Sequence, residues 1–185
     1  DVDGVVEMML DATQRHDQKL STQRLFAWHT SLFPKEKTVM FPIVVGKWRD
    51  NTDSDPMQVV SGPLGREKVH FEAPPSNRLE AEMNSFLKWL NTEQDLDAVL
   101  KAAIAHLWFV TIHPFDDGNG RIARAITDML LTRADKTSNR FYSMSSEIRN
   151  RRKDYYQVLE STQKGDLNIT EWLIWFLDCL EGAFD

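Results

Sequence analysis

Apolar residues recur every three or four positions along most of the chain, which is the spacing of amphipathic helices. Residues 98–112 are apolar on nearly every side, a pattern typical of a buried central helix. The chain is therefore predicted to be an all-α bundle. The helical stripes are Val5, Met8, Met9 and Ala12; Leu25, Trp28, His29 and Leu32; Leu79, Met83, Phe86, Leu87 and Leu90; Ile122, Ile126, Met129 and Leu130; Ile148, Tyr155, Tyr156 and Leu159; and Trp172, Trp175, Phe176, Cys179 and Leu180.

Polar residues and prolines beside the stripes mark where helices are expected to begin and end. Ser21 and Thr170 are suited to cap helix N-termini, because their hydroxyl groups accept bonds from free backbone N–H groups. Asn77 and Glu80 have the spacing of a capping box at the start of the third stripe. Pro34 is expected to end the second helix.

One stretch, residues 41–75, breaks the helical pattern with proline, glycine and β-branched residues. Apolar and polar side chains alternate at 68–72, and an apolar pair stands in 59–61, as in half-buried strands. Residues 62–65 between them read Gly-Pro-Leu-Gly, which is a turn signal, and Pro74-Pro75 close the segment. A small β-hairpin is therefore predicted on the bundle.

Composition narrows the class of protein. The chain has 185 residues, 42% hydrophobic and 27% charged, which is typical of a globular domain and excludes disordered or fibrous classes. Cys179 is its one cysteine, so no disulfide framework or multi-cysteine zinc site is expected within the chain. The net charge of −6 argues against direct binding of nucleic acid, and no apolar run is long enough for a membrane span. Because the first residue is Asp1, we expect a piece of a longer cytoplasmic protein.

The run 113–124 concentrates residue types that bind phosphates. Pro114 is expected to end the central helix, since proline lacks a backbone donor and disfavours helix before it. Gly118 and Gly120 allow a sharp turn and the close approach of a ligand. A new helix is expected to begin near Asn119, and its free N–H groups would favour an anion.

Charged side chains in the same run complete a site for a metal-bound polyphosphate. Arg121 and Arg124 are three residues apart on the new helix, so two guanidinium groups share a side. Asp117 is a candidate ligand of Mg²⁺, which binds one or two carboxylates together with phosphate oxygens. His113 stands where a general base would act on an incoming hydroxyl group. The residues alone therefore favour phosphoryl or nucleotidyl transfer.

Each feature also has a simpler structural interpretation, as a helix cap, a turn or a surface ion pair. Their occurrence together within twelve residues, in a workable order, favours the site. A metal-hydrolase site built from His106, His113, Asp116 and Asp117 is an alternative, although Pro114 breaks the helix and the arginines nearby would repel a cation.

The run resembles the motif of the Fic family, H-x-F-x-[DE]-G-N-G-R-x-x-R, at every defined position. Residues 46–49, Gly-Lys-Trp-Arg, are similar to a short G-x-[aromatic]-R element of that family. Residues 62–66 and 69–75 resemble its hairpin "flap", and 140–180 resemble its C-terminal helices. The resemblance implies a single Fic-type helical domain over residues 1–185, with the motif in a loop between two core helices.

The resemblance also implies an activity. Fic proteins typically transfer AMP from Mg–ATP to a Ser, Thr or Tyr hydroxyl group of a target protein and release pyrophosphate. By this match His113 would be the base on the target hydroxyl, Phe115 would anchor the loop in the core, and Asp117 would bind Mg²⁺. Residues 118–120 would form the anion hole for the α- and β-phosphates, and Arg121 and Arg124 would contact the β- and γ-phosphates.

Residues outside the motif are assigned more loosely. An exposed hairpin edge can pair with an extended segment, which makes Val69, His70 and Phe71 candidates for docking the target; a capped edge strand is the alternative. One of Tyr155 and Tyr156 is a candidate for stacking on adenine.

Two further polar features lie in the C-terminal part. Arg149, Arg151, Arg152 and Lys153 form a basic cluster, either a solvated helix face or a contact for a nucleotide or an acidic target. Gln163 stands where some family members place an amide that contacts the base.

Many Fic proteins carry an inhibitory helix with the motif [ST]-x-x-x-E-[GN]. The one glutamate followed by glycine or asparagine here is Glu181, and Leu177 stands four residues before it, so the motif is absent. We expect an inhibitory helix upstream of this chain, or a partner such as an antitoxin that supplies it. Two alternatives to transfer stay open: removal of AMP by the same site, and a regulatory module that only binds nucleotide or phosphate.

Overall fold

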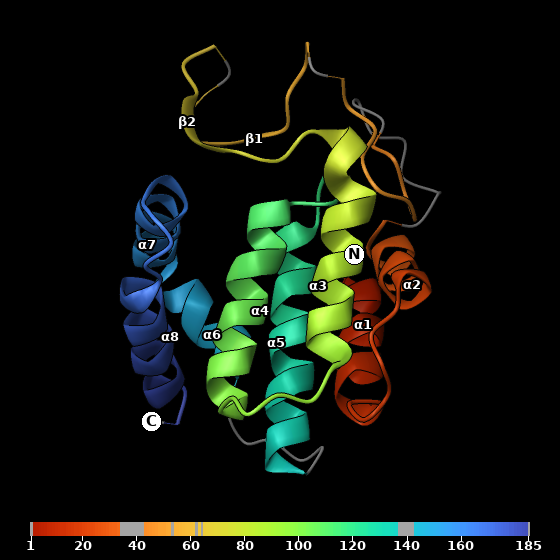
Figure 1. Cartoon of the computed structure of the whole chain (residues 1–185), viewed down its shortest axis with the longest axis vertical. Coiled ribbons are helices and arrows are strands. Elements are labelled where there is room, and N and C mark those ends of the chain that lie inside the picture. The colour runs from red at the N-terminus through yellow and green to blue at the C-terminus, as the bar shows by residue number, and fades with distance from the viewer. Residues whose placement is uncertain are drawn as a thin grey trace.

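The fold is a bundle of helices that carries a short hairpin at one end (Figure 1). The computed structural model describes residues 2–33, 43–52, 54–61, 63, 65–136 and 143–184. The all-α bundle with one small hairpin predicted from the sequence is confirmed. In chain order the elements are α1 (Val2–Gln14), α2 (Thr22–Leu32), β1 (Gln58–Ser61), β2 (Lys68–Glu72), the 3₁₀ turn η1 (Ser76–Arg78), α3 (Leu79–Asn91), α4 (Ala98–Ile112), α5 (Asn119–Asp135), α6 (Met144–Asn150), α7 (Arg152–Lys164) and α8 (Thr170–Gly182).

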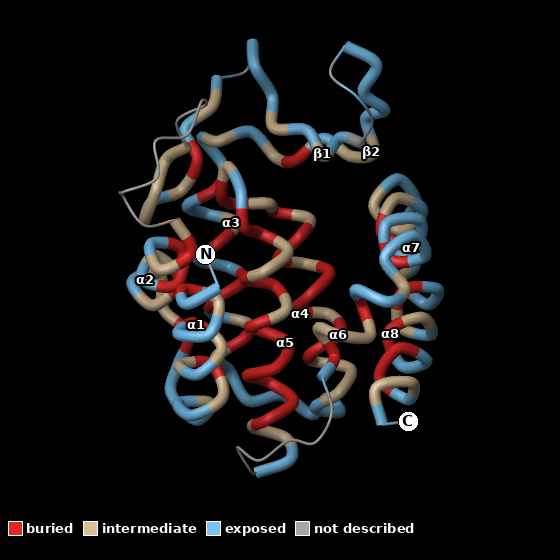
Figure 2. Tube along the Cα trace, turned by 180° about the vertical axis from the view of Figure 1, so that it is seen from behind, coloured by how far each residue is buried: buried red, intermediate tan, exposed pale blue. Residues whose placement is uncertain are grey.

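Helices α4 and α5 form the centre of the bundle. They run side by side in opposite directions, with α1, α2 and α3 on one side and α6, α7 and α8 on the other (Figure 1). Figure 2 shows buried residues along both central helices. Helix α4 can be buried because Lys101 is its only charged residue, and Phe109 and Ile112 near its end are almost fully buried. The short loop that joins α4 to α5 therefore rests on a packed core.

The hairpin lies at the same end of the bundle as the α4–α5 loop (Figure 1). Strand β1 pairs antiparallel with β2, and the register shifts between Val59 and Val60, which marks a β-bulge. The turn residues Gly62 and Leu64, and Pro34 and Phe41 before the hairpin, lie outside the described residues. No helix in the described ranges is long and apolar enough to cross a bilayer.

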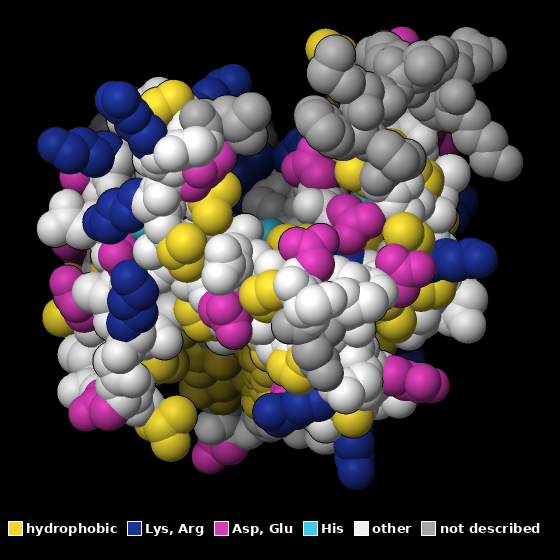
Figure 3. Space-filling model, turned by 90° about the horizontal axis from the view of Figure 1, so that it is seen from above, with side chains coloured by type: hydrophobic (Ala, Val, Ile, Leu, Met, Phe, Trp, Pro, Cys, Tyr) yellow, Lys and Arg dark blue, Asp and Glu magenta, His cyan; other side chains and the backbone are white. Residues whose placement is uncertain are grey.

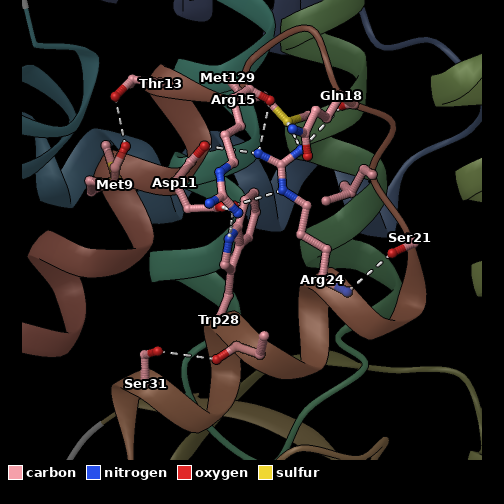
Figure 4. A network of polar contacts seen from close by, with 12 residues as sticks. Met9, Asp11, Thr13, Arg15, Gln18, Ser21, Arg24, Trp28, Ser31 and Met129 are labelled. Carbon is pink, nitrogen blue, oxygen red and sulfur yellow. Dashed lines mark hydrogen bonds and ion pairs between the residues drawn. The ribbon is translucent and has the colours of Figure 1, made fainter.

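A polar network joins α1 to α2 (Figure 4). The Asp11 carboxylate accepts bonds from Arg24 Nε and Trp28 Nε1, each at 2.7 Å. Burial raises the pKa of Asp11, but these two hydrogen bonds and the Arg24 charge outweigh it and lower the pKa overall. Arg24 also donates to the backbone carbonyls of Asp11, Arg15 and Gln18. The network holds α1 against α2 at one side of the bundle.

Of the helix caps predicted from the sequence, the one at Ser21 is confirmed and the other two are wrong. Ser21 caps α2, since its hydroxyl group accepts a bond from Arg24 N–H at 3.1 Å. The capping box is wrong: Asn77 lies in η1, and α3 begins at Leu79 without a side-chain cap. The Thr170 cap is also wrong, because this residue is already helical and its N–H donates to Asn168 Oδ1.

One predicted stripe belongs to two helices. The pattern from Ile148 to Leu159 predicts one helix, but α6 ends at Asn150 and α7 starts at Arg152. Tyr155 is buried as expected, whereas the Tyr156 side chain is exposed and faces a pocket. The break changes the direction of the chain, which brings α7 beneath the hairpin (Figure 1).

Candidate active site

His113 ends α4 and opens the loop. Its backbone lies in the left-handed region (φ 51°, ψ 58°), and its N–H still donates to the carbonyl of Phe109. The ring Nδ1 lies 3.2 Å from the carbonyl oxygen of Val110, so Nδ1–H is the donor and Nε2 keeps a free electron pair. Burial lowers the pKa of His113 to about 4, assisted by the Arg49 charge and opposed by the Val110 bond.

This low pKa predicts a histidine that is neutral throughout the physiological range. An NMR titration of the free protein should give a midpoint near pH 4 for His113, with its signal assigned from the His113→Ala variant. Because the unfolded chain has the ordinary pKa of 6.5, the folded state loses stability as the pH falls from 6.5 towards 4. A midpoint at or above pH 6 would contradict a His113 ring that is neutral near pH 7.

The turn after His113 is held by an asparagine. Asn119 Oδ1 accepts a bond from the N–H of Phe115 at 2.9 Å, and Asn119 Nδ2 donates to the carbonyl of the same residue at 2.7 Å. Gly118 has φ 86°, and a Cβ there would stand 3.1 Å from the ring of Phe33. The Asn119 amide is used inside the loop. At the start of α5 the free backbone N–H groups, and not this side chain, are therefore available to an anion.

Phe115 anchors the loop in the core. Its ring is fully buried and stacks on the imidazole of His29 with centroids 4.1 Å apart. His29 Nδ1 accepts a bond from the N–H of Gly46, and Nε2 donates to the carbonyl of Asp117 at 3.1 Å. Burial lowers the pKa of His29, which keeps the ring neutral for these two roles. His29 of α2 therefore holds the α4–α5 loop in place, through its ring contact with Phe115 and its bond to the Asp117 carbonyl.

Arg49 fastens the end of α4 to the segment before the hairpin. It is 2% exposed, and its guanidinium donates to the carbonyls of His113 (2.7 Å), Ile112 (3.3 Å) and Pro74. Its own N–H donates to the carbonyl of Pro114 at 3.0 Å. The carbonyls of Ile112, His113 and Pro114 have no helical partner, because α4 ends there. Arg49 thus fixes the position from which the imidazole projects.

The two aspartates of the loop differ in their surroundings. Asp116 Oδ2 accepts a bond from the N–H of Val44 at 2.8 Å, which ties the loop to the segment before Arg49. The Asp117 side chain is 61% exposed, accepts a bond from the N–H of Gly118 and pairs with Arg121 at 3.2 Å. Asp117 is therefore the carboxylate that faces solvent at the mouth of the site.

A pocket of about 280 Å³ opens over this loop. Its walls include His113, Asp117, Arg121 and Arg124 as well as residues 118–120, so the structure brings these candidates together. Arg124 has no carboxylate within salt-bridge distance among the residues that the structure describes. The pocket thus combines an unprotonated imidazole, the start of a helix and two guanidinium groups.

Comparison with known proteins shows the family of this chain. Residues 19–131 match the sequence model of the Fic/DOC family. The chain belongs to the Fic/DOC family. It is 35% identical over 136 residues to a protein named protein adenylyltransferase Fic from Drosophila grimshawi, and equally to one from Aedes aegypti. That match covers 71% of this chain and 26% of the Drosophila protein, so the chain spans about a quarter of the length of these relatives.

Solved structures give the same fold. A Fic family protein from Desulfovibrio desulfuricans G20 superposes with a TM-score of 0.72 at 24% identity, over 97% of this chain and 51% of the other. Residues 134–508 of Fic-1 from C. elegans superpose with a TM-score of 0.62 at 22% identity, over 98% of this chain and 50% of the other. At these identities the likeness concerns the fold alone.

The hairpin of this Fic domain covers one side of the pocket. His70 and Val59 line the pocket, whereas the other two predicted flap residues, Val69 and Phe71, do not. His70 Nδ1 bonds to the carboxylate of Glu160 on α7, and Lys68 and Lys164 also pair with that carboxylate, at 3.4 and 2.8 Å. Bonds from Lys164 and His70 lower the pKa of Glu160 to about 2. Glu160 therefore ties the flap to α7.

Removing the Glu160 carboxylate should make the hairpin open more often. In Glu160→Gln, the amides of β1 and β2 are expected to exchange hydrogen a few times faster than in the wild type, because a partly exposed ion-pair cluster stabilises weakly. Hydrogen exchange read by mass spectrometry measures this. The control is Asp154→Asn, which removes a negative charge from an exposed position of the same helix. Equal exchange rates in the two variants would contradict the tie.

The metal-hydrolase alternative is wrong. His106 is fully buried within the Fic bundle, with Nδ1 bonded to Thr127 Oγ1 and Nε2 to the hydroxyl group of Tyr155, each at 2.9 Å. Both ring nitrogens are therefore used, and burial lowers the pKa of His106 to about 3. In the described parts of the chain, no three His, Cys, Asp or Glu side chains gather as a metal site.

Sequence patterns missed three residues that support the site. His29 stood among apolar residues of one stripe, and a polar residue at a core position is a signal that it has a specific partner. Arg49 stands in a short family element that gives no sign of its contacts with α4. Nothing near Glu160 in the sequence indicates its contact with the hairpin, because His70 and Lys68 are 90 and 92 residues away. Gln163 lines the pocket as the resemblance suggests and donates to Thr111 Oγ1 at 3.0 Å.

Proposed function

We propose that this Fic domain transfers AMP from Mg–ATP to a hydroxyl group of a target protein, with release of pyrophosphate. The observation that carries the proposal is the imidazole of His113, whose Nε2 is unprotonated and lines the same pocket as the start of α5 and two guanidinium groups. The adenylyltransferase names of the relatives support the same activity.

The division of roles follows from the contacts. His113 Nε2 would take the proton of the target hydroxyl group, while its Nδ1–H bond to Val110 holds the ring in place. The N–H groups at the start of α5 would bind the α- and β-phosphates. Arg121 and Arg124 would bind the β- and γ-phosphates, where fixed charges stabilise the transition state without rearranging.

Magnesium fits the donor set that the pocket offers. Mg²⁺ prefers one or two carboxylates and otherwise binds phosphate oxygens and water. Asp117 supplies one exposed carboxylate at the pocket, next to the arginines that would hold the phosphates. When bound there with ATP, Mg²⁺ would neutralise charge on the phosphate oxygens.

The flap would hold the target. Strands β1 and β2 pair only with each other in the described part of the hairpin, so an outer edge remains for an extended segment. His70 lines the pocket, whereas Val69 and Phe71 of β2 would contact a segment that pairs along this strand. An edge of this kind binds backbone, which would bring hydroxyl groups to His113 with little dependence on sequence.

An acidic regulator, whether a helix or an antitoxin partner, is part of the proposal. Its support is Arg124, whose half-buried guanidinium lacks a carboxylate partner among the described residues. A glutamate supplied from outside would compete with the γ-phosphate for this group.

Labelled ATP tests the transfer directly. The protein is incubated with Mg²⁺, a cell lysate and ATP labelled on either the α- or the γ-phosphate, and proteins are then separated. Adenylyl transfer predicts label from α-phosphate only, and mass spectrometry should find AMP on Ser, Thr or Tyr. Label from γ-phosphate, or nucleotide binding without any label, would contradict the proposal, and the latter would favour a binding module.

A further inference from the structure

A second cavity lies beside the active-site pocket. Its volume is about 580 Å³, and it shares Arg121, Arg124, Tyr155 and Tyr156 with the first pocket. His113 and the hairpin line only the first pocket, whereas helices α1 and α6 line only the second. Arg121 and Arg124 therefore lie between the first pocket, where a target would bind, and the second cavity.

The second cavity is strongly basic. Arg149 of α6 and Arg152 of α7 join the two arginines of α5, and no aspartate or glutamate is among the described residues that line it. Figure 3 looks onto the hairpin end of the molecule and shows Lys and Arg side chains gathered along the α7 side. Four guanidinium groups around one cavity repel one another, and an anion would relieve that repulsion.

Arg149 and Arg152 are exposed and form no ion pair with another described residue. The neighbouring Arg151, in contrast, pairs with Glu147. Arg152 lies over the ring of Tyr156, 5.7 Å from its centroid, which orients its side chain. The opposite wall is apolar, formed by Val5, Met8 and Met9 of α1. An apolar wall weakens solvent screening and strengthens the attraction between arginine and anion.

We propose that Arg149 and Arg152, together with Arg121 and Arg124, form a subsite for the pyrophosphate that leaves during adenylyl transfer; this inference rests on the proposed function. In that reaction the target oxygen forms a bond to the α-phosphorus and its proton passes to His113 Nε2. The bond from the α-phosphorus to the bridging oxygen breaks, and pyrophosphate keeps the electron pair.

The in-line geometry of the transfer indicates that pyrophosphate leaves towards the second cavity. The attacking and leaving oxygens lie roughly in line on opposite sides of the phosphorus. The target would approach from the side of His113 and the flap, so the leaving group would face away from them. Arginine forks bind phosphate oxygens in pairs, which suits the terminal oxygens on the two phosphorus atoms of pyrophosphate. The subsite would thus guide pyrophosphate away without displacing the target.

Binding of inorganic pyrophosphate tests the subsite without any transfer. Calorimetry is done in EDTA, so that no metal bridges the anion to Asp117. We expect Arg149→Ala/Arg152→Ala to weaken the Kd by about tenfold or more, because two charge-assisted contacts are lost. Arg149→Lys/Arg152→Lys should give an intermediate Kd, since lysine keeps the charge but not the fork. The control, Arg66→Ala/Lys88→Ala, removes two exposed charges elsewhere and should bind as the wild type does.

Product inhibition then separates this subsite from the ATP site. In the double alanine variant, the inhibition constant of pyrophosphate should rise by a larger factor than the KM for ATP. An unchanged Kd for pyrophosphate, or equal rises in both constants, would overturn the subsite. Pyrophosphate binding that depends on these arginines in a protein that transfers no AMP would instead count against the proposed function alone.

Discussion

Replacing His113 by alanine is expected to lower the kcat of AMP transfer by about 10²- to 10⁴-fold, the usual contribution of a general base. The pocket should still bind ATP, because the phosphate contacts come from the start of α5 and the two arginines. Transfer is measured with α-labelled ATP, and ATP affinity by calorimetry on the same preparation. The KM for ATP should change little, since the base acts in the transition state.

The matched control for this variant is His16→Ala. His16 lies in the loop after α1 and is absent from the walls of the pocket, and its ring Nδ1 has no hydrogen-bond partner among the residues that the structure describes. Its loss should leave the rate as in the wild type. A His113→Ala protein that transfers AMP at the wild-type rate while folded would show that another group takes the proton.

Arg49→Met is expected to lower the free energy of unfolding by about 3 kcal/mol, because one buried and two partly buried carbonyls lose their donor. For a chain of this size that corresponds to a fall in Tm of about 6–12 °C. Methionine keeps much of the length of the side chain, so the loss would reflect the hydrogen bonds to Ile112, His113 and Pro74 more than packing. Thermal unfolding followed by circular dichroism measures the change.

A second effect of Arg49→Met should appear in catalysis. With the end of α4 no longer tied to the segment before the flap, His113 is held less firmly, and kcat should fall at temperatures where the protein is still folded. Arg66→Met is the control, since it makes the same chemical change at an exposed hairpin position. If both variants unfold at the same temperature, the hydrogen bonds of Arg49 do not stabilise the fold.

The features that the sequence predicts correctly are those whose residues are neighbours in the chain. Helix periodicity found the buried faces, and the run 113–124 gave the loop, because neighbouring residues carry both patterns. Contacts between distant segments left no such trace: His29 meets Asp117 across 88 residues, and Arg49 meets His113 across 64. The capping box failed for a related reason, since a 3₁₀ turn entering α3 satisfies the backbone without the Asn77 side chain.

Helix α7 takes part in two sites at once. Its Glu160 ties the flap, and its Tyr156 and Arg152 border the cavities on either side of the motif arginines. A displacement of this one helix would therefore alter nucleotide affinity and target affinity together, and by thermodynamic linkage each ligand would change the other's binding by the same factor.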